Sequence, residues 1–325
     1  MRAPEFWNHQ GIVPSILSPL GTLYGFSVQV KQARAHPYRA NARVLCIGNL
    51  TAGGTGKTPV AIAAAKKLAA RGLRIVFLTR GYGGHARGPV LVDPARHSAA
   101  EVGDEPLLLA AHGATIVARD RAKGAQLADA LEANVIVMDD GFQNFSIRKD
   151  VSLIVVDAAS GFGNGRMIPA GPLREPVERG LARADAVLLA GDGFPPFLPF
   201  HGPVLRTHLE PTTPDMLKGR VAIAFAGIGR AEKFFDMLRG MGMELLGTRS
   251  FPDHHPFTTS ELSELKRSAQ AAGAILVTTQ KDFVRIDQEA RRDIVPVPVH
   301  AVFSDDAAFG CLLDRLAIAG NVGSS

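Results

Sequence analysis

The fold is decided by residues 43–72, which read RVLCIGNLTAGGTGKTPVAIAAAKKLAARG. An apolar strand, a glycine-rich turn and a helix follow one another here, and Gly-Lys-Thr occupies positions 56–58. A turn of this kind presents successive backbone N–H groups to phosphate oxygens, and its lysine and Mg²⁺-binding hydroxyl complete the site. A strict Walker A motif, however, has a glycine at the position that Thr51 occupies in this chain.

Phosphate binding is the better interpretation of this turn despite the missing glycine. The glycines that precede Lys57 allow the backbone to approach a ligand, and the dipole of the following helix favours an anion. A turn rich in glycine for packing alone would leave Lys57 at a helix start without an anion. We therefore predict that a nucleotide is bound by the residues of this turn, which are Thr51, Ala52, Gly53, Gly54, Thr55, Gly56, Lys57 and Thr58.

A matching acidic pair follows a second apolar run. Residues 135–138 are apolar, and Asp139 and Asp140 come directly after them, where the carboxyl end of a strand would lie. One of these carboxylates is expected to hold Mg²⁺ directly or through water. A lone Asp-Gly pair is also typical of a turn, but its combination with the phosphate loop favours a nucleoside triphosphatase or a kinase.

Length, composition and charge set the outer limits. The chain has 325 residues, of which 46% are hydrophobic, as in an ordinary globular protein. Its formal net charge of +5 suits an acidic partner, which leaves nucleic acid, an anionic lipid surface and a phosphorylated substrate open. Cys46 and Cys311 form neither a disulfide framework nor a zinc set, so a reducing compartment is expected.

The order of apolar runs predicts an α/β fold with a P-loop NTPase-like, mostly parallel sheet covered by helices. Strands are expected at 74–79, 115–119, 134–138, 151–156 and 186–189, with helices at 58–71, 105–112 and 121–132 between them. A proline-rich stretch at 191–214 reads as a connection, followed by further strand and helix patterns. We therefore expect a core at residues 41–204 and a smaller C-terminal α/β subdomain at 205–325, with a cleft between them.

The N-terminal segment lacks charged residues between positions 6 and 30, and basic residues follow it. Its length would suffice to cross a bilayer, but Pro14, Pro19 and several polar side chains argue against a spanning helix. Apolar residues recur at helical spacing. Residues 1–40 are therefore expected to lie in the interface of an anionic membrane. Packing as a buried helix on the protein is the alternative, and the two are compatible if one face docks on the core.

Several polar clusters fall at other predicted strand ends. They are LTRGYGGHARG at 78–88, VGDEPLLLA at 102–110, VARDRAKGA at 117–125, PAGPLREP at 169–176 and FPDHHPF at 251–257. Each has an ordinary structural explanation when taken alone, such as a helix cap, a solvated ion pair or a loop. Their joint placement around one predicted cleft favours a functional role.

With these segments, the sequence closely resembles the tetraacyldisaccharide 4′-kinases, the lipid A 4′-kinases of Gram-negative bacteria. The resemblance rests on segments between Gly48 and Asp282, which are GNLTAGGTGKTP, LTRGYGG, VGDEPLLLA, DDGFQ, GPLREP, FPDHHPF and TTQKD. Each segment alone is weakly specific, whereas their combination is highly specific. The phosphate loop of that family also lacks the first glycine, and the family often has an acidic residue in place of Gln280.

The resemblance implies a membrane-associated kinase on the cytoplasmic face of the bacterial inner membrane. It implies that the γ-phosphate of ATP is transferred, with Mg²⁺, to the 4′-hydroxyl of a tetraacyldisaccharide 1-phosphate. By motif, Asp104 is expected to accept the hydroxyl proton, His254 to orient or tune it, and Lys57 to neutralise phosphate charge. The residues expected around Mg²⁺ are Thr58, Asp139, Asp140 and Glu175.

Three other classes of protein compete with this interpretation. A deviant-Walker, membrane-associated ATPase typically has a lysine just before the Gly-Gly pair, where this chain has Ala52. A GTPase would carry an N-K-x-D base-reading motif, and TQKD has a different order. A nucleic-acid-binding ATPase would suit the basic charge, but the sequence contains no recognised nucleic-acid-binding motif, so no such partner is expected.

Overall fold

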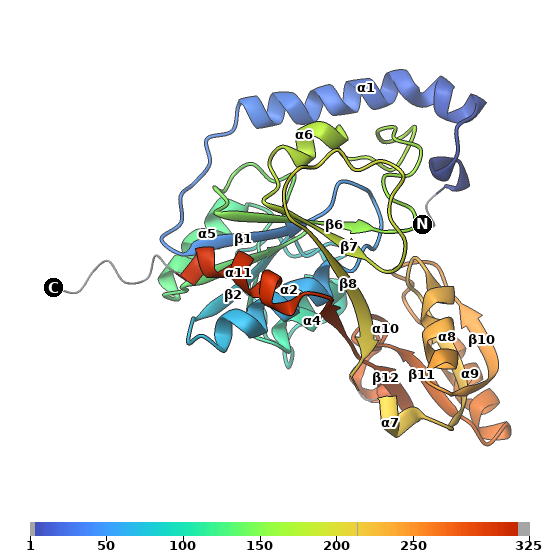
Figure 1. Cartoon of the computed structure of the whole chain (residues 1–325). Helices are drawn as coiled ribbons and strands as arrows, with labels where there is room; N and C mark the ends of the chain where they lie inside the picture. Colours follow the sequence, from blue (N-terminus) through green and yellow to red (C-terminus); the bar gives the residue numbers. More distant parts are fainter. Residues whose placement is uncertain (1–3, 213, 318–325) are drawn as a thin grey trace.

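The computed structural model describes residues 4–212 and 214–317, which build two β-sheets with covering helices (Figure 1). The larger sheet has the order β13-β8-β7-β6-β1-β5-β2-β4-β3. Its strands are β1 (Arg43–Gly48), β2 (Ile75–Thr79), β3 (Val90–Leu91), β4 (Ala114–Val117), β5 (Val135–Asp139), β6 (Val151–Asp157), β7 (Ala186–Ala190), β8 (Val204–Pro211) and β13 (Val299–Phe303). Only β3 against β4 and β13 against β8 run antiparallel, so the predicted mostly parallel sheet is confirmed.

Helices cover both faces of the larger sheet. One face packs against α2 (Lys57–Ala69), α4 (Asp104–Ala110) and α11 (Asp306–Ala317), and the other against α5 (Arg121–Ala130) and α6 (Val177–Leu181). Alternate residues of β1 enter the two cores, Val44 and Cys46 on one side and Leu45 and Ile47 on the other. Burial on both faces explains why these strands read as continuous apolar runs.

The predicted strands and helices of the core are present, and their ends differ from the predicted ones by at most two residues. The central strand β1 pairs with β5 on one side and β6 on the other. Their carboxyl ends therefore bring the phosphate loop and the Asp139–Asp140 pair to the same edge of the sheet. The short elements of the described chain outside the two sheets include α3 (Ala99–Val102), η1 (Glu5–Asn8) and η2 (Gln288–Arg291).

The smaller sheet has the order β10-β9-β11-β12, and its neighbours all pair parallel. Its strands and helices are α7 (Pro214–Leu217), β9 (Val221–Ala226), α8 (Ala231–Gly240), β10 (Glu244–Ser250), α9 (Thr259–Ala271), β11 (Ile275–Thr279), α10 (Gln280–Phe283) and β12 (Ile294–Val297). We call residues 214–297 the inserted unit, because β8 before it and β13 after it both belong to the larger sheet.

The expected boundary at residue 205 does not coincide with the division between the sheets. β8 and β13 pair with each other as neighbours at one edge of the larger sheet, and α11 packs on the same core as α2. Antiparallel pairing between strands about 90 residues apart leaves no local signal in the sequence. For this reason the sequence pattern groups the polar, partly exposed β8 with the segment that follows it.

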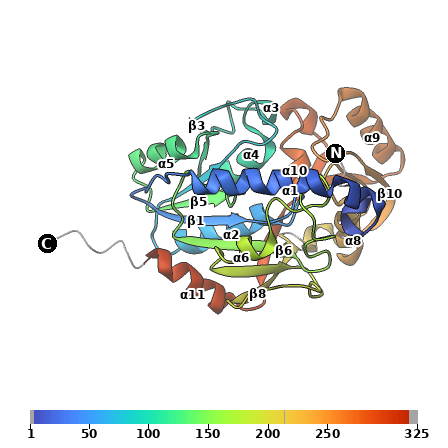
Figure 2. The ribbon, with the colours of Figure 1, turned by 90° about the horizontal axis from the view of Figure 1, so that it is seen from above.

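The N-terminal helix α1 (Ile12–Ala33) lies lengthwise over the face of the larger sheet that carries α6 (Figures 1 and 2). Gly21 and Gly25 face Met167, and a Cβ atom added at Gly21 would lie 2.8 Å from the Met167 backbone oxygen. Apolar side chains of α1 point away from the protein, with Ile12 79% and Ile16 71% exposed. One face therefore docks on protein while the other presents apolar surface to the surroundings.

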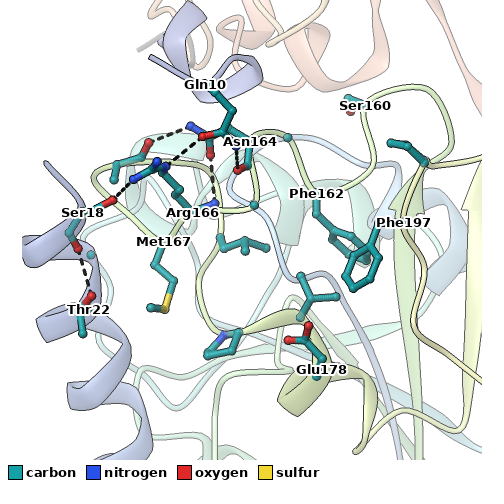
Figure 3. A pocket seen from close by; sticks show the side chains of 18 residues that line it. Gln10, Ser18, Thr22, Ser160, Phe162, Asn164, Arg166, Met167, Glu178 and Phe197 are labelled. Atoms are coloured by element: carbon teal, nitrogen blue, oxygen red, sulfur yellow. Dashed lines mark hydrogen bonds between the residues drawn. The ribbon is translucent and has the colours of Figure 1, made fainter. Parts of the chain in front are cut away.

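Polar contacts fix the start of this helix. Arg166 bonds to Gln10, Ser18 and the Pro14 carbonyl, and the Trp7 Nε1–H donates to the Pro169 carbonyl at 3.0 Å. Figure 3 shows Arg166 and Met167 beside a cavity of about 430 Å³ between α1 and residues 160–178. Among the described residues, no helix is long and apolar enough to cross a bilayer.

Candidate active site

The phosphate loop joins β1 to α2, and two of its residues adopt a left-handed backbone conformation. Gly53 and Gly56 have φ values of +121° and +84°, which favour glycine. A Cβ atom added at either position would meet nothing within 4 Å, so the backbone is open to a ligand. Buried Asn49 stabilises the loop from below, because its Nδ2 lies 3.4 Å from both the Gly53 carbonyl and the Thr55 hydroxyl.

Thr51 explains the departure from the strict Walker pattern. Its backbone forms an antiparallel bridge with Leu173, and the next N–H, that of Ala52, donates to the Pro172 carbonyl at 2.8 Å. Residue 51 is therefore part of a short extended pairing, in which a β-branched side chain is favoured. No positive φ is needed there, and a glycine would bring no advantage.

Thr58 and Asp139, two of the four residues expected around Mg²⁺, are in direct contact. The Thr58 hydroxyl donates to Asp139 Oδ2 at 2.8 Å, and Asp139 is 1% exposed. Its other oxygen, Oδ1, has no hydrogen-bond partner among the described residues. Burial raises the pKa of Asp139, the charge of Glu105 adds to this, and Lys57 and Thr58 only partly offset it. An unpaired, buried carboxylate oxygen of this kind fits a cation.

Asp140 lies in a different electrostatic environment from its neighbour. Its Oδ1 accepts a hydrogen bond from Arg174 at 2.7 Å and lies 3.7 Å from Lys57 Nζ. Burial alone would raise the pKa of Asp140, but Lys57 and Arg174 together lower it. The backbone of Asp140 has a φ of +51°, an uncommon conformation that concentrates at functional sites.

Glu175 is not joined to this pair. Its carboxylate, 2% exposed, forms an ion pair with Arg183 at 2.8 Å and accepts a hydrogen bond from Gln143 at 2.9 Å. The same Gln143 amide also donates to the Asn49 carbonyl at 2.9 Å. Within the described ranges, no three His, Cys, Asp or Glu side chains are close enough together to hold a metal ion. The predicted Mg²⁺ ligands thus lie at one edge of the sheet without forming a closed cage.

Asp104 and His254 meet across the junction between the core and the inserted unit. Asp104 is the first residue of α4 and follows Gly103, whose φ is +95° and whose added Cβ would lie 2.5 Å from the Tyr82 carbonyl. His254 Nδ1 lies 3.1 Å from Asp104 Oδ2 and donates to it, since a carboxylate only accepts. The predicted pairing of these two residues is therefore present in the structure.

The two histidines of FPDHHPF have different surroundings. His255 Nε2 lies 3.0 Å from Glu261, and its ring stacks on Phe251, so it belongs to the packing of the inserted unit. His254 has a φ of +59° and contacts the ring of Tyr82 edge-on at 5.3 Å. Of these two histidines, His254 is the one that contacts Asp104.

Two further cations surround Asp104. Arg285 Nε donates to Asp104 Oδ2 at 2.8 Å, and Lys281 Nζ lies 3.9 Å from the same oxygen and 3.4 Å from Glu105. Burial would raise the pKa of Asp104, but His254, Lys281 and Arg285 hold it well below its usual range. Asp104 is therefore a buried carboxylate that stays ionised.

The sequence did not single out Arg285, Gln143 or Asn49. Arg285 lies four residues after Lys281 of TTQKD, in the turn that follows the short helix α10, and both side chains reach Asp104. That spacing was the available signal. Among the other clusters, Arg121 is 3% exposed and bonds to the Ala118 carbonyl, and burial lowers its pKa to about 10.

Comparison with known proteins agrees with the resemblance seen in the sequence. Residues 13–317 match the family described as tetraacyldisaccharide-1-P 4′-kinase. Proteins named tetraacyldisaccharide 4′-kinase from Paramagnetospirillum magneticum and Dinoroseobacter shibae are 48% and 49% identical to this chain. The alignments cover 98% and 97% of this chain, and 99% and 98% of those proteins.

A solved structure agrees at the level of the fold. The crystal structure of LpxK from Aquifex aeolicus in complex with ATP is 28% identical and matches with a TM-score of 0.77. The match covers 94% of this chain and 99% of that one. On the family match and the identity of its relatives, the chain belongs to the tetraacyldisaccharide-1-P 4′-kinase family.

Proposed function

We propose that this kinase transfers the γ-phosphate of ATP to the 4′-hydroxyl of a tetraacyldisaccharide 1-phosphate in lipid A biosynthesis. The observation that carries the proposal is the Asp104–His254 pair, which is built from both parts of the chain beside an open phosphate loop. A loop alone fits any nucleoside triphosphatase. A buried, ionised carboxylate paired with an imidazole is what transfer to a hydroxyl requires.

Asp104 has one oxygen available for the proton of the acceptor hydroxyl. Oδ2 is occupied by Arg285 and His254, whereas Oδ1 accepts only the Glu105 N–H, at 3.0 Å, among the described residues. We assign proton acceptance to Oδ1 and orientation of the carboxylate to His254. In a loose phosphoryl-transfer transition state the proton moves late, so a weakly basic carboxylate suffices.

Mg²⁺ is assigned to the Thr58–Asp139 pair. The unpartnered Oδ1 of Asp139 and its raised pKa are features that a divalent cation would relieve. Asp140 adds negative charge close by, and Glu175 would reach the ion only after giving up its contacts with Arg183 and Gln143. Mg²⁺ is commonly held by one or two protein ligands together with phosphate oxygens, where it neutralises the charge that develops on the transferred group.

The lipid acceptor is expected at an anionic membrane surface, on the cytoplasmic face of the inner membrane. The exposed apolar side chains of α1 would enter the interface, and the basic residues that follow would meet lipid phosphate. The cavity beneath α1 has both apolar and polar lining, including Phe162, Met167 and Arg166, which suits an acylated sugar. Hydrolysis by a deviant-Walker ATPase would need none of these features.

The test is ATP-dependent phosphorylation of the purified disaccharide 1-phosphate in detergent micelles. Asp104→Asn should lower kcat by about 10²–10⁴-fold with the KM for ATP within a few-fold of wild type. Asp236→Asn, which changes an exposed aspartate of the inserted unit in the same way, should have no effect. ATP consumption that does not depend on the lipid would contradict the proposal, and wild-type turnover by Asp104→Asn would exclude Asp104 as the proton acceptor.

A further inference from the structure

A buried arginine connects the inserted unit to Asp104. The side chain of Arg285 is only 6% exposed, and its Nε–H donates to Asp104 Oδ2 at 2.8 Å. Nη2 lies 2.6 Å from the same oxygen as an ion-pair contact without the alignment of a hydrogen bond. Nη1 points back into the inserted unit, toward Asp282 Oδ1 at 2.7 Å and the Gly227 carbonyl at 2.8 Å.

Asp282 is placed to hold this arginine. Its carboxylate is fully buried, and Oδ2 accepts the Gly227 N–H at 2.9 Å and the Thr279 hydroxyl at 2.7 Å. Oδ1 is left for Arg285. These contacts tie Arg285 to the carboxyl ends of β9 and β11, so its position follows that of the whole inserted unit.

The charged groups around Asp104 contact one of its two carboxylate oxygens, Oδ2. Arg285 and His254 hold Oδ2, while Lys281 lies farther away and is shared with Glu105. A buried carboxylate without such partners would take up a proton and lose its ability to accept another. The contacts to Oδ2 thus keep Asp104 charged and leave Oδ1 with the Glu105 N–H as its one hydrogen-bond donor among the described residues.

We propose that Arg285 is a positioning residue for phosphoryl transfer, which fixes Asp104 from the inserted unit and keeps its Oδ1 free for the acceptor hydroxyl. The proposal rests on the assignment of Asp104 as the proton acceptor. Arg285 itself touches neither nucleotide nor acceptor in this scheme. Its planar guanidinium serves Asp104 and Asp282 at once, which an ammonium group does less well.

The test measures kcat and the KM for ATP of Arg285→Met and Arg285→Lys, with Arg249→Met as the control. Arg249 lies in the same unit and forms a solvent-exposed pair with Glu264. We expect a loss in kcat of at least about 10-fold for Arg285→Met, with the KM for ATP changed by less than about 3-fold. Arg285→Lys should recover part of the loss, and the control should match wild type.

A second background separates positioning from folding. If Arg285 acts through Asp104, Arg285→Met should change kcat by less than about 2-fold in Asp104→Asn protein, because the two losses are not additive. An equal loss in both backgrounds, or none in wild type, would overturn the proposal. Should Arg285→Met fail to fold, Asp282→Asn and Arg285→Lys give the same comparison. If Asp104→Asn is impaired and the two losses add, only the positioning role of Arg285 is contradicted. If Asp104→Asn is fully active, the assignment of Asp104 as the proton acceptor is wrong, and so is this inference.

Discussion

Two adjacent residues at one strand end have pKa values shifted in opposite directions. Asp139 and Asp140 are adjacent, yet burial raises the pKa of the first while Lys57 and Arg174 lower that of the second. Their contacts separate them, because Asp140 forms ion pairs with Lys57 and Arg174 whereas Asp139 accepts a hydrogen bond from the Thr58 hydroxyl. Neighbouring carboxylates can therefore differ in the role that they take in one site.

Asp139 should make the metal-free protein less stable as the pH rises. Its pKa is raised in the folded state, so the folded protein binds more protons than the unfolded chain from about pH 4 upward. Stability is thus highest below the unfolded pKa and is lost as the pH rises through the folded one. In thermal denaturation at pH 8 without Mg²⁺ or nucleotide, Asp139→Asn should unfold at a higher temperature than wild type.

The control for this prediction is the same measurement with Mg²⁺ and ATP. Because Asp139 is assigned to Mg²⁺, the two ligands together should stabilise wild type more than Asp139→Asn, which keeps the phosphate loop but lacks the charged oxygen. Equal stability of the two proteins at pH 5 and pH 8 in the absence of ligand would show that the buried charge of Asp139 does not destabilise the folded protein.

At the scale of elements, α1 combines two faces with different tasks. The glycines beside Met167 and the bonds from Arg166 keep one face on the core, whereas the opposite face remains apolar and exposed. The amphipathic pattern was readable from the sequence, but the partner of the docked face was not. Residues 166 and 167 lie more than 130 positions away and are joined to α1 only by the fold.

Charge on the exposed face of α1 should weaken the proposed membrane association. Ile16 and Leu23 are 71% and 66% exposed, so Ile16→Glu with Leu23→Glu removes apolar surface and adds repulsion from anionic lipid. We expect at least about a 10-fold loss in vesicle partitioning, measured by co-sedimentation, with the free energy of unfolding changed by no more than about 0.5 kcal/mol.

A matched pair of charges elsewhere serves as the control. Ser263→Glu with Gln270→Glu places the same charge on exposed positions of α9. This variant should sediment like wild type. If both double variants lose binding equally, net charge governs the association and the apolar face of α1 does not.

At the scale of the whole molecule, carboxylates of the core contact the inserted unit at two places. Asp104 contacts the unit through His254, Lys281 and Arg285. Asp157, at the end of β6, contacts Arg230 and Lys233 at the start of α8 and also accepts the Ser160 hydroxyl at 2.8 Å. The contacts at Asp104 and Asp157 thus attach the unit to the core on both sides of the phosphate loop.

Weakening the contacts of Asp157 with the inserted unit should lower kcat, although Asp157 does not contact Asp104. Asp157→Asn weakens the contacts with Arg230 and Lys233, so the unit presents His254 and Arg285 to Asp104 less often. We expect kcat to fall about 3- to 10-fold with little change in the KM for ATP, measured in the lipid kinase assay. Asp236→Asn on α8 should leave turnover intact, and an unchanged kcat for Asp157→Asn would mean that the first attachment suffices.

The same carboxylate gives a pH signature. Burial would raise the pKa of Asp157, but Ser160, Arg230 and Lys233 lower it to about 2. The stability that it contributes is therefore present above the unfolded pKa near 4 and is lost as the pH falls toward 2.

The sequence predicted what is local and left out what is distant. The phosphate loop, the acidic pair and most core strands follow from spacing within about 15 residues, and they are present. The pairing of β8 with β13 and the contact of Arg285 with Asp104 join positions about 90 and 180 residues apart. Neither involves a pattern that periodicity or propensity can detect, because the partners meet only once both sheets have formed.

The arrangement of β8 and β13 has a practical consequence for protein engineering. Pro211 and Val299 are partners in the same antiparallel ladder, so the chain leaves the core and returns to it at nearly one point. A two-residue hairpin such as Asn-Gly between them would close the edge of the larger sheet without residues 212–298. The shortened protein would keep the phosphate loop and Asp139 but lack His254, Lys281 and Arg285. Such a protein would allow ATP binding to be measured separately from phosphoryl transfer.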